Sequence, residues 1–168
     1  MTVEWKGVFP ALTTKFTADG RLDLDLFDLN LQAQLTAGVH GIILGGTLGE
    51  SSVLELNEKE SLVKFAVEKV NGKVPVILNI AEGSTREAIK QAELAGKWGA
   101  SGLMLLPPMR YKPDHREAVN WFKTIANSTS LPIMIYNNPV DYKTEVTLDM
   151  FEEILACENI QAVKESTR

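Results

Sequence analysis

Short β-rich runs recur along the chain at a nearly regular spacing. They begin near Gly7, Gly41, Val74, Gly102, Leu131 and Ile160. Three of them are continuously apolar rather than alternating, which is typical of parallel strands that are covered on both faces: Gly41–Leu44, Val74–Leu78 and Gly102–Leu106. A spacing of roughly 30 residues is the length of one strand–helix–strand unit. The pattern therefore predicts six parallel strands in an α/β fold.

Helical patterns lie between these runs, and most of them carry a start signal. Leu24, Phe27, Leu31 and Leu35 recur at helical spacing and predict a helix over about 23–37 that ends before Gly38. Further helix starts are predicted where a capping residue precedes a glutamate or an apolar segment. They lie at Asn57–Glu60, Ser84–Glu87, Asp114–Glu117 and Thr147, the last of which caps a segment through Ala156.

The repeated strand-then-helix order fits a (β/α)8 TIM barrel or an open doubly wound sheet. No Gly-x-Gly-x-x-Gly follows the first strand, which disfavours the dinucleotide-binding version of the open sheet. Polar residues instead follow almost every strand, as the catalytic face of a barrel requires. They are Thr13 and Thr14, Thr47 and Glu50, Asn79 and Glu82, Tyr136 and Asn137, and Lys164 and Glu165.

The length of the chain is short for a complete barrel. A barrel of eight strands usually needs about 250 residues, and this chain has 168. We therefore expect a single barrel domain over 1–168 that is truncated after strand six.

The composition of the chain limits the kinds of partner and compartment that we expect for it. The hydrophobic content of 45% and charged content of 23% are those of an ordinary globular protein. A net charge of −5 offers no basic surface, so we expect no nucleic-acid partner. A single cysteine, Cys157, cannot form an internal disulfide and fits a reducing cytoplasm. The start of the chain lacks a signal-peptide pattern, and no apolar stretch reaches the roughly 20 residues of a membrane helix, so no membrane association is expected.

Lys164 and Tyr136 end successive strands of the predicted fold, so both side chains should point into one pocket. A lysine amine beside a phenol suits Schiff-base chemistry, with the amine as nucleophile and the phenol moving protons. Burial at a barrel mouth would lower the pKa of the amine and make its neutral form available. Taken singly, the lysine could be covering apolar surface with its stem and the tyrosine could be a rim residue. The pairing favours the chemical interpretation.

A glycine-rich segment, Gly45–Ser51, follows the second strand. Its glycines could serve only a sharp turn, or they could expose N–H groups to a carboxylate or carbonyl oxygen. The two histidines, His40 and His115, have no second ligand at metal-binding spacing. No metal site is therefore expected, and a metal-dependent aldolase is disfavoured.

Four motifs together resemble the dihydrodipicolinate synthase / N-acetylneuraminate lyase superfamily over the whole chain. They are Gly7–Thr14, Gly46–Glu50, Tyr136–Pro139 and Val163–Ser166. The resemblance implies a (β/α)8 barrel, usually a homotetramer, that acts on a small 2-oxo acid or imine carboxylate without a cofactor. It implies that Lys164 forms the Schiff base and that Tyr136 handles protons. It also implies substrate-binding roles for Gly46, Thr47, Leu48 and Asn138.

The chain departs from the synthase pattern at three places. Leu48 stands where synthases usually carry a second threonine. Met109 and its neighbours stand where synthases carry a second tyrosine, unless Tyr111 takes that place. Asp141 lies in the region where synthases carry an arginine for the second substrate's carboxylate. An anionic aldehyde should be repelled there, because like charges at close range disfavour binding.

Other segments resemble the 1-pyrroline-4-hydroxy-2-carboxylate deaminases of hydroxyproline catabolism. They are Trp5–Ala11, Gly38–Gly41, Leu106–Met109, Tyr111–Pro113 and Ile133–Val140. In that branch the lysine adds to the ring's C2 imine carbon, the ring opens, and water and ammonia are released. We expect this deaminase first, a 4-hydroxy-tetrahydrodipicolinate synthase or pyruvate-dependent aldolase second, and an inactive barrel fragment third.

Overall fold

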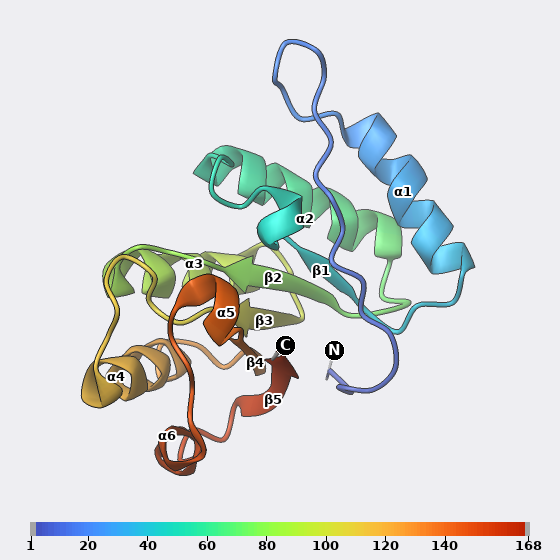
Figure 1. Cartoon of the computed structure of the whole chain (residues 1–168). Helices are drawn as coiled ribbons and strands as arrows, with labels where there is room; N and C mark the ends of the chain where they lie inside the picture. Colours follow the sequence, from blue (N-terminus) through green and yellow to red (C-terminus); the bar gives the residue numbers. More distant parts are fainter. Residues whose placement is uncertain (1–2, 167–168) are drawn as a thin grey trace. The chain divides into compact units, whose positions relative to one another are not determined.

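The computed structural model describes residues 3–166 as alternating helices and strands, in the order drawn in Figure 1. The chain divides into two compact units. The first comprises Met1–Asn79 with Lys97–Gly102, and the second comprises Ile80–Gly96 with Leu103–Arg168. Each unit is an assembly of helices and parallel strands. The expectation of one barrel domain over 1–168 stays a prediction.

The first unit contains two parallel strands and two long helices. Its elements are α1 (Leu24–Thr36), β1 (Ile42–Leu44), the 3₁₀ turn η1 (Thr47–Gly49), α2 (Leu56–Val70) and most of β2 (Val76–Ile80). β1 and β2 pair in parallel, with Ile42 opposite Val76 and Leu44 opposite Leu78. Every residue of both strands is buried, as the continuous apolar runs predict. Helices α1 and α2 contact each other.

The N-cap of α1 confirms the predicted start of that helix, whereas the N-cap of α2 shows that the predicted start of α2 is wrong. The Asp23 carboxylate accepts the Leu26 N–H at 2.8 Å, and α1 begins at the next residue. α2 starts earlier than predicted, because Glu55 is its N-cap and forms a reciprocal capping box with Glu58. That box pairs two backbone N–H groups that would otherwise lack partners. Asn57 therefore lies within the first turn, and the prediction that it caps the helix is wrong.

The predicted first strand does not form a regular ladder. Ala11 makes an isolated parallel bridge to Ile43, flanked by bonds from the Leu12 N–H to the Ile43 carbonyl and from the Ile43 N–H to the Pro10 carbonyl, each 2.9 Å. Pro10 has no N–H to donate, so the ladder cannot extend through it on both sides. The residues from 3 to 166 thus contain five strands rather than the six expected.

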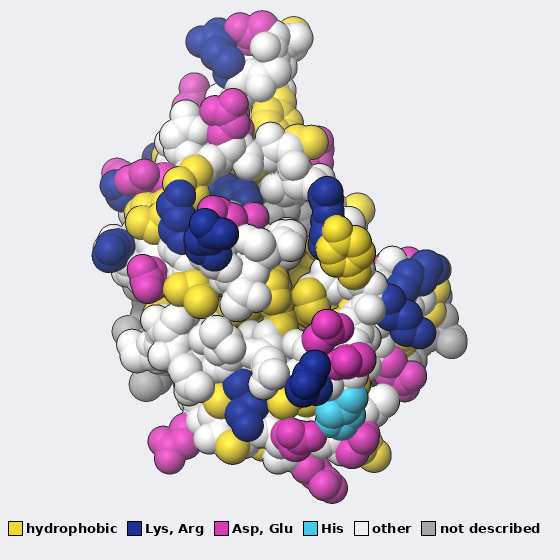
Figure 2. Space-filling model, turned by 90° about the vertical axis from the view of Figure 1, so that its left-hand side faces the viewer, with side chains coloured by type: hydrophobic (Ala, Val, Ile, Leu, Met, Phe, Trp, Pro, Cys, Tyr) yellow, Lys and Arg dark blue, Asp and Glu magenta, His cyan; other side chains and the backbone are white. Residues whose placement is uncertain are grey.

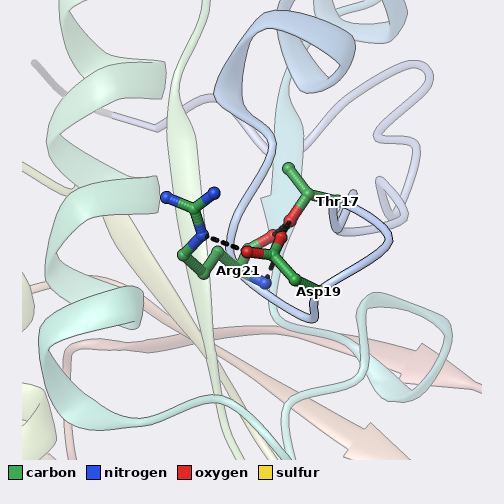
Figure 3. Close-up of polar contacts among 3 residues, drawn as sticks. All are labelled: Thr17, Asp19 and Arg21. Atoms are coloured by element: carbon green, nitrogen blue, oxygen red, sulfur yellow. Dashed lines mark hydrogen bonds and ion pairs between the residues drawn. The ribbon is translucent and has the colours of Figure 1, made fainter.

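A small turn that the sequence patterns did not predict follows this segment. Phe16 and Leu22 form an antiparallel bridge, and the Thr17 N–H donates to the Arg21 carbonyl at 2.8 Å. Figure 3 shows the Asp19 carboxylate between its two partners, the Thr17 hydroxyl and the Arg21 Nε, the latter at 2.8 Å. These two hydrogen bonds hold the pKa of Asp19 below its usual value. The turn is thus closed by side chains as well as by the backbone.

The second unit holds three parallel strands and four helices. Its elements are most of α3 (Thr85–Lys97), β3 (Gly102–Leu105), α4 (His115–Ala126), β4 (Ile133–Asn137), α5 (Pro139–Tyr142), α6 (Leu148–Ile154) and β5 (Ile160–Glu165). β4 pairs in parallel with β3 on one side and with β5 on the other. Three consecutive parallel strands joined by helices are repeated βαβ units, as the spacing of the apolar runs predicts.

Two of the helix starts in this unit are confirmed, and one helix is shorter than expected. The Ser84 hydroxyl accepts the Glu87 N–H at 3.3 Å, and the Asp114 carboxylate accepts the Glu117 N–H at 2.8 Å. Thr147 is the N-cap of α6, but its hydroxyl bonds the Asp149 carboxylate instead of a backbone N–H. α6 ends at Ile154, short of the predicted Ala156. The four-residue α5 was not predicted.

A β-bulge in β5 determines which of its side chains lies opposite Tyr136. Ile133 pairs with Ile160, but the next residue, Met134, pairs with Ala162. Gln161 is therefore an extra residue on β5, as in a β-bulge. Beyond the bulge the register is regular and places Lys164 opposite Tyr136.

β5 is less buried than the other strands, in which every residue is buried except the partly buried Tyr136 of β4. Its exposure alternates, with Gln161 exposed and Val163 48% exposed. On one face of this strand, Gln161, Val163 and Glu165 are exposed.

Helices α4 and α6 contact each other, and His115 forms ion pairs between them. Its Nε2 lies 2.6 Å from Glu153 Oε1, and its Nδ1 lies 3.5 Å from Asp149 Oδ2. The hydrogen bond to Glu153 raises the pKa of His115 above its ordinary value of 6.5, against the opposing effect of burial, and the nearby carboxylate charges act in the same direction as the bond.

This ion pair predicts a pH-dependent contribution to stability. A histidine whose pKa is raised in the folded state stabilises fully below its unfolded pKa, and this stabilisation is lost as pH rises through the folded pKa. We expect wild type to melt at a higher temperature than His115→Gln at about pH 5, with the difference shrinking towards about pH 9. Thermal melts of both proteins across that range test this. A difference that grows with pH would contradict the assignment.

Candidate active site

The structure brings together Lys164 and Tyr136, the two catalytic residues expected from the sequence. They are partners in the register of β5 and β4, so their side chains leave the same face of the sheet. The Lys164 Nζ lies 3.8 Å from the centroid of the Tyr136 ring. An ammonium over a phenol ring is attracted by the ring's quadrupole. Both side chains are only partly buried, so a small molecule can reach them.

The hydroxyl of Tyr136 accepts a hydrogen bond from Asn138. The Asn138 Nδ2 donates to the phenol oxygen at 3.2 Å, and the edge of Tyr142 contacts the ring, with centroids 5.4 Å apart. Burial raises the pKa of Tyr136. Hydrogen bonds from Asn138, Lys164 and Ser166, together with the Lys164 charge, outweigh that effect and lower the pKa below its usual value of 10.0. The phenol therefore releases its proton more readily than an ordinary tyrosine.

Asn138 lies beside the reacting pair, but its amide is already engaged. It is 2% exposed and caps α5, and its Nδ2 also donates to Asp141 Oδ2 at 2.7 Å. The role of Asn138 in substrate binding stays a prediction. Sequence reasoning treated Asp141 only as a departure from a family pattern and missed its link to Tyr136. An Asn three residues before an acidic residue, at a Pro-initiated turn, is the signal that could have indicated it.

Asn137 and Glu165, the last residues of β4 and β5, tie the loops together. The Asn137 Nδ2 donates to Glu165 Oε2 at 2.8 Å and to the Val146 carbonyl at 3.2 Å. Its Oδ1 accepts the Val146 N–H at 2.9 Å, and its backbone carbonyl accepts the Ser166 N–H at 2.9 Å. These bonds connect the carboxyl ends of β4 and β5 to the loop before α6. They hold the strand ends that carry Tyr136 and Lys164.

The glycine loop of the first unit is held at both ends by buried side chains. The Asn79 Nδ2 donates to the Gly45 carbonyl at 2.8 Å, and the Thr14 hydroxyl donates to the Gly49 carbonyl at 2.6 Å. Between these points Thr47 and Leu48 are exposed, Leu48 by 74%. The loop is thus fixed at its base and open at its tip. That Gly46, Thr47 and Leu48 bind substrate at the same mouth as Tyr136 and Lys164 stays a prediction.

Substitutions within this loop should differ sharply in their effect on stability. A Cβ added at Gly49 would lie 2.9 Å from the Leu12 carbonyl oxygen, whereas one at Gly46 would meet only the Ala11 Cβ at 3.6 Å. We expect Gly49→Ala to lower the free energy of unfolding by about 1–3 kcal/mol, because the backbone must shift. Gly46→Ala is the matched control and should change it little. Urea unfolding of both variants measures the difference, and equal losses would contradict this account.

The charged side chains on the surface agree with the charge composition of the sequence. On the face shown in Figure 2, positively and negatively charged side chains are interspersed. Among residues 3–166, no cluster of three or more His, Cys, Asp or Glu side chains could hold a metal ion. None of the helices in that part of the chain is long and apolar enough to cross a membrane.

Comparisons with known proteins identify relatives along nearly the whole chain. A 4-hydroxy-tetrahydrodipicolinate synthase of Chelativorans sp. (strain BNC1) is 39% identical, over 97% of this chain and 56% of the relative. An uncharacterized DapA-like lyase of Rhizobium meliloti is 34% identical, over 100% of this chain and 56% of the relative. The chain therefore spans little more than half the length of these relatives.

Solved structures show the same extent of similarity. Dihydrodipicolinate synthase from Aquifex aeolicus superimposes with a TM-score of 0.93 at 34% identity, over 97% of this chain and 56% of that one. An Escherichia coli K12 prophage protein of the same family, solved in complex with pyruvate, gives a TM-score of 0.91 at 30% identity, over 96% of this chain and 54% of that one. The fold is thus the α/β TIM barrel of these proteins, over the part of their length that this chain spans. Residues 4–168 match the dihydrodipicolinate synthetase family, to which the chain belongs.

Proposed function

We propose that this chain carries the Schiff-base centre of a lyase that acts on a 2-oxo acid, with Lys164 as the covalent residue. The observation that carries the proposal is the Lys164 amine 3.8 Å from the ring centroid of Tyr136, at the carboxyl ends of adjacent parallel strands. The carboxyl ends of parallel strands are where barrel enzymes place their catalytic residues. Pyruvate, found with the E. coli relative, is a 2-oxo acid.

The chemistry needs one amine and one group that moves protons. The neutral Lys164 amine adds to the C2 carbonyl carbon and forms a carbinolamine. Tyr136 then donates a proton to the carbinolamine hydroxyl, which leaves as water, and the nitrogen loses a proton as the imine forms. Its lowered pKa makes Tyr136 a better proton donor. The amine and the carbonyl thus become one imine and one water.

For the substrate's carboxylate, the proposed binding segment is the loop of Gly46, Thr47 and Leu48. Thr47 begins a 3₁₀ turn, and Thr47 and Leu48 are exposed at its tip. This role rests on the resemblance to the family. By the same resemblance, we propose a homo-oligomer, a tetramer by the family pattern, in the cytoplasm.

For the overall reaction, the comparisons favour condensation of pyruvate with an aldehyde. Relatives at 39%, 34% and 37% identity are named 4-hydroxy-tetrahydrodipicolinate synthases. They support the synthase over the deaminase that the sequence motifs favoured. The deaminase remains the second candidate on one observation: the Asp141 carboxylate is held 2.7 Å from Asn138, beside Tyr136, where an anionic aldehyde would be repelled.

Two measurements test these proposals. Incubation of the full-length protein with pyruvate and borohydride should leave one reduced adduct, on the peptide containing Lys164. Adduct on another lysine would refute the assignment. A comparison of kcat/KM for pyruvate–aldehyde condensation with that for ammonia release from the hydroxypyrroline then separates the candidates. We expect condensation to be faster, and faster ammonia release would establish the deaminase.

A further inference from the structure

Asn138 and Asp141 form a hydrogen-bonded pair next to the Tyr136 hydroxyl, and the Schiff-base steps above give Asp141 no role. The Asn138 Nδ2 donates to the Tyr136 oxygen at 3.2 Å and to Asp141 Oδ2 at 2.7 Å. The Asp141 backbone N–H donates to Asn138 Oδ1 at 3.2 Å. Three hydrogen bonds therefore fix the orientation of one carboxamide that is 2% exposed.

The direction of the bond to Tyr136 follows from the chemistry of the amide. A carboxamide nitrogen only donates, so the phenol oxygen must accept. The phenol's own proton is then directed away from Asn138. Lys164 and Ser166, on and after β5, both affect the phenol through hydrogen bonds. A phenolate would keep the N–H bond from Asn138 and strengthen it, because charge-assisted hydrogen bonds are the stronger ones.

We infer that Asp141 is a positioning residue of this site: it holds Asn138 so that the amide donates to Tyr136, and thereby directs the tyrosine's proton towards the Lys164 adduct. The inference rests on the proposed function and adds to it. Asp141 acts through Asn138 and is not itself a catalytic residue. Near Tyr136 in the second unit, Lys164 of β5 lies over the ring, Tyr142 of α5 contacts the ring, and Asp141 of α5 is linked to the hydroxyl through Asn138.

Asp141 has two possible effects on Tyr136, and they have opposite signs. Its negative charge alone disfavours a phenolate and raises the pKa of the tyrosine. As an anchor for Asn138 it keeps an N–H donor on the phenol oxygen, which lowers that pKa. A substitution of Asp141 that removes its charge but keeps an oxygen to accept the Asn138 N–H therefore separates the two effects.

The experiment compares Asp141→Ala with Asp141→Asn in the full-length protein. The Tyr136 phenol is titrated by its ultraviolet absorbance, with the Tyr136→Phe spectrum subtracted. Asp141→Ala should raise the pKa of Tyr136 and lower kcat about tenfold, with KM nearly unchanged, because loss of one hydrogen bond to a charged group is of that order. Asp141→Asn should keep both the pKa of Tyr136 and kcat close to their wild-type values, since its amide oxygen can still accept the Asn138 N–H.

A second variant and a control keep the test decisive. Asn138→Asp retains the size and capping oxygen of the side chain but loses the N–H donor, so it should raise the pKa of Tyr136 at least as far as Asp141→Ala does. Glu145→Gln removes an exposed carboxylate nearby and should change neither value. A fall in the pKa of Tyr136 in both Asp141 variants would show that the charge alone acts, and would overturn the inference. Absence of borohydride trapping at Lys164 in wild type would refute the proposed function, while the titration would still decide the role of Asp141.

Discussion

Lys164→Met should abolish borohydride trapping by a 2-oxo acid and lower kcat by on the order of 10⁴-fold or more, since removal of a covalent nucleophile has effects of that size. Methionine is similar in length to lysine and apolar, so it can still lie against the Tyr136 ring without an amine to form an imine. The measurement is mass spectrometry of the trapped protein together with steady-state kinetics. The fold should persist, because Lys164 lies on the strand with the least complete burial.

Lys112→Met is the matched control for this substitution. Lys112 is exposed and lies in the loop before α4, away from β4 and β5 in the chain. The Lys112→Met variant should form the borohydride-reduced adduct with the 2-oxo acid, and its kcat should equal that of wild type. Loss of trapping in Lys112→Met with retention in Lys164→Met would disprove the assignment of the nucleophile.

Tyr136→Phe should lower kcat by about 10²–10⁴-fold, the usual size of a general acid–base contribution. The ring remains, so its contacts with the Tyr142 ring and with the Lys164 amine are kept. The hydroxyl is lost, together with its hydrogen bonds from Asn138, Lys164 and Ser166. The Schiff base should still form, but more slowly, because proton transfer to the leaving hydroxyl must come from water. Single-turnover trapping rates measure this directly.

Tyr142→Phe provides the comparison for that result. It removes a hydroxyl from the neighbouring ring and keeps the edge-to-face contact with Tyr136. We expect a much smaller effect on kcat. If both variants lost activity equally, the hydroxyl of Tyr136 would have no special role.

Much of the fold and the central pair of the site could be predicted because both depend on local or periodic signals. Short β-rich runs predicted β1 to β5, and hydroxyl and carboxylate side chains predicted the caps at Ser84 and Asp114. Lys164 and Tyr136 were predictable because each directly ends a strand. A capping glutamate at Glu55 was missed, because glutamate is not among the preferred N-cap residues.

The remaining features depend on geometry that periodicity does not encode. The link from Asp141 through Asn138 to Tyr136 requires the four-residue α5 to fold the chain back, and so short an element has no periodic signal. The bulge at Gln161 is equally hidden, because a pattern of apolar residues gives no information on which backbone groups pair.

The bulge in β5 also bears on how such sites should be sought in other sequences. The start of the strand is anchored independently, since the Asn159 side chain donates to the carbonyls of Ala126, Thr129 and Leu131 at 2.9, 3.0 and 3.3 Å. Between this anchor and Lys164 the strand holds one residue more than its partner needs. A homologue with a single-residue deletion there would regain a regular ladder and keep its lysine opposite the tyrosine. A one-residue insertion would require a second bulge or turn the lysine to the opposite face. A search pattern for this family should therefore tolerate a shorter segment between the start of the strand and the lysine more readily than a longer one.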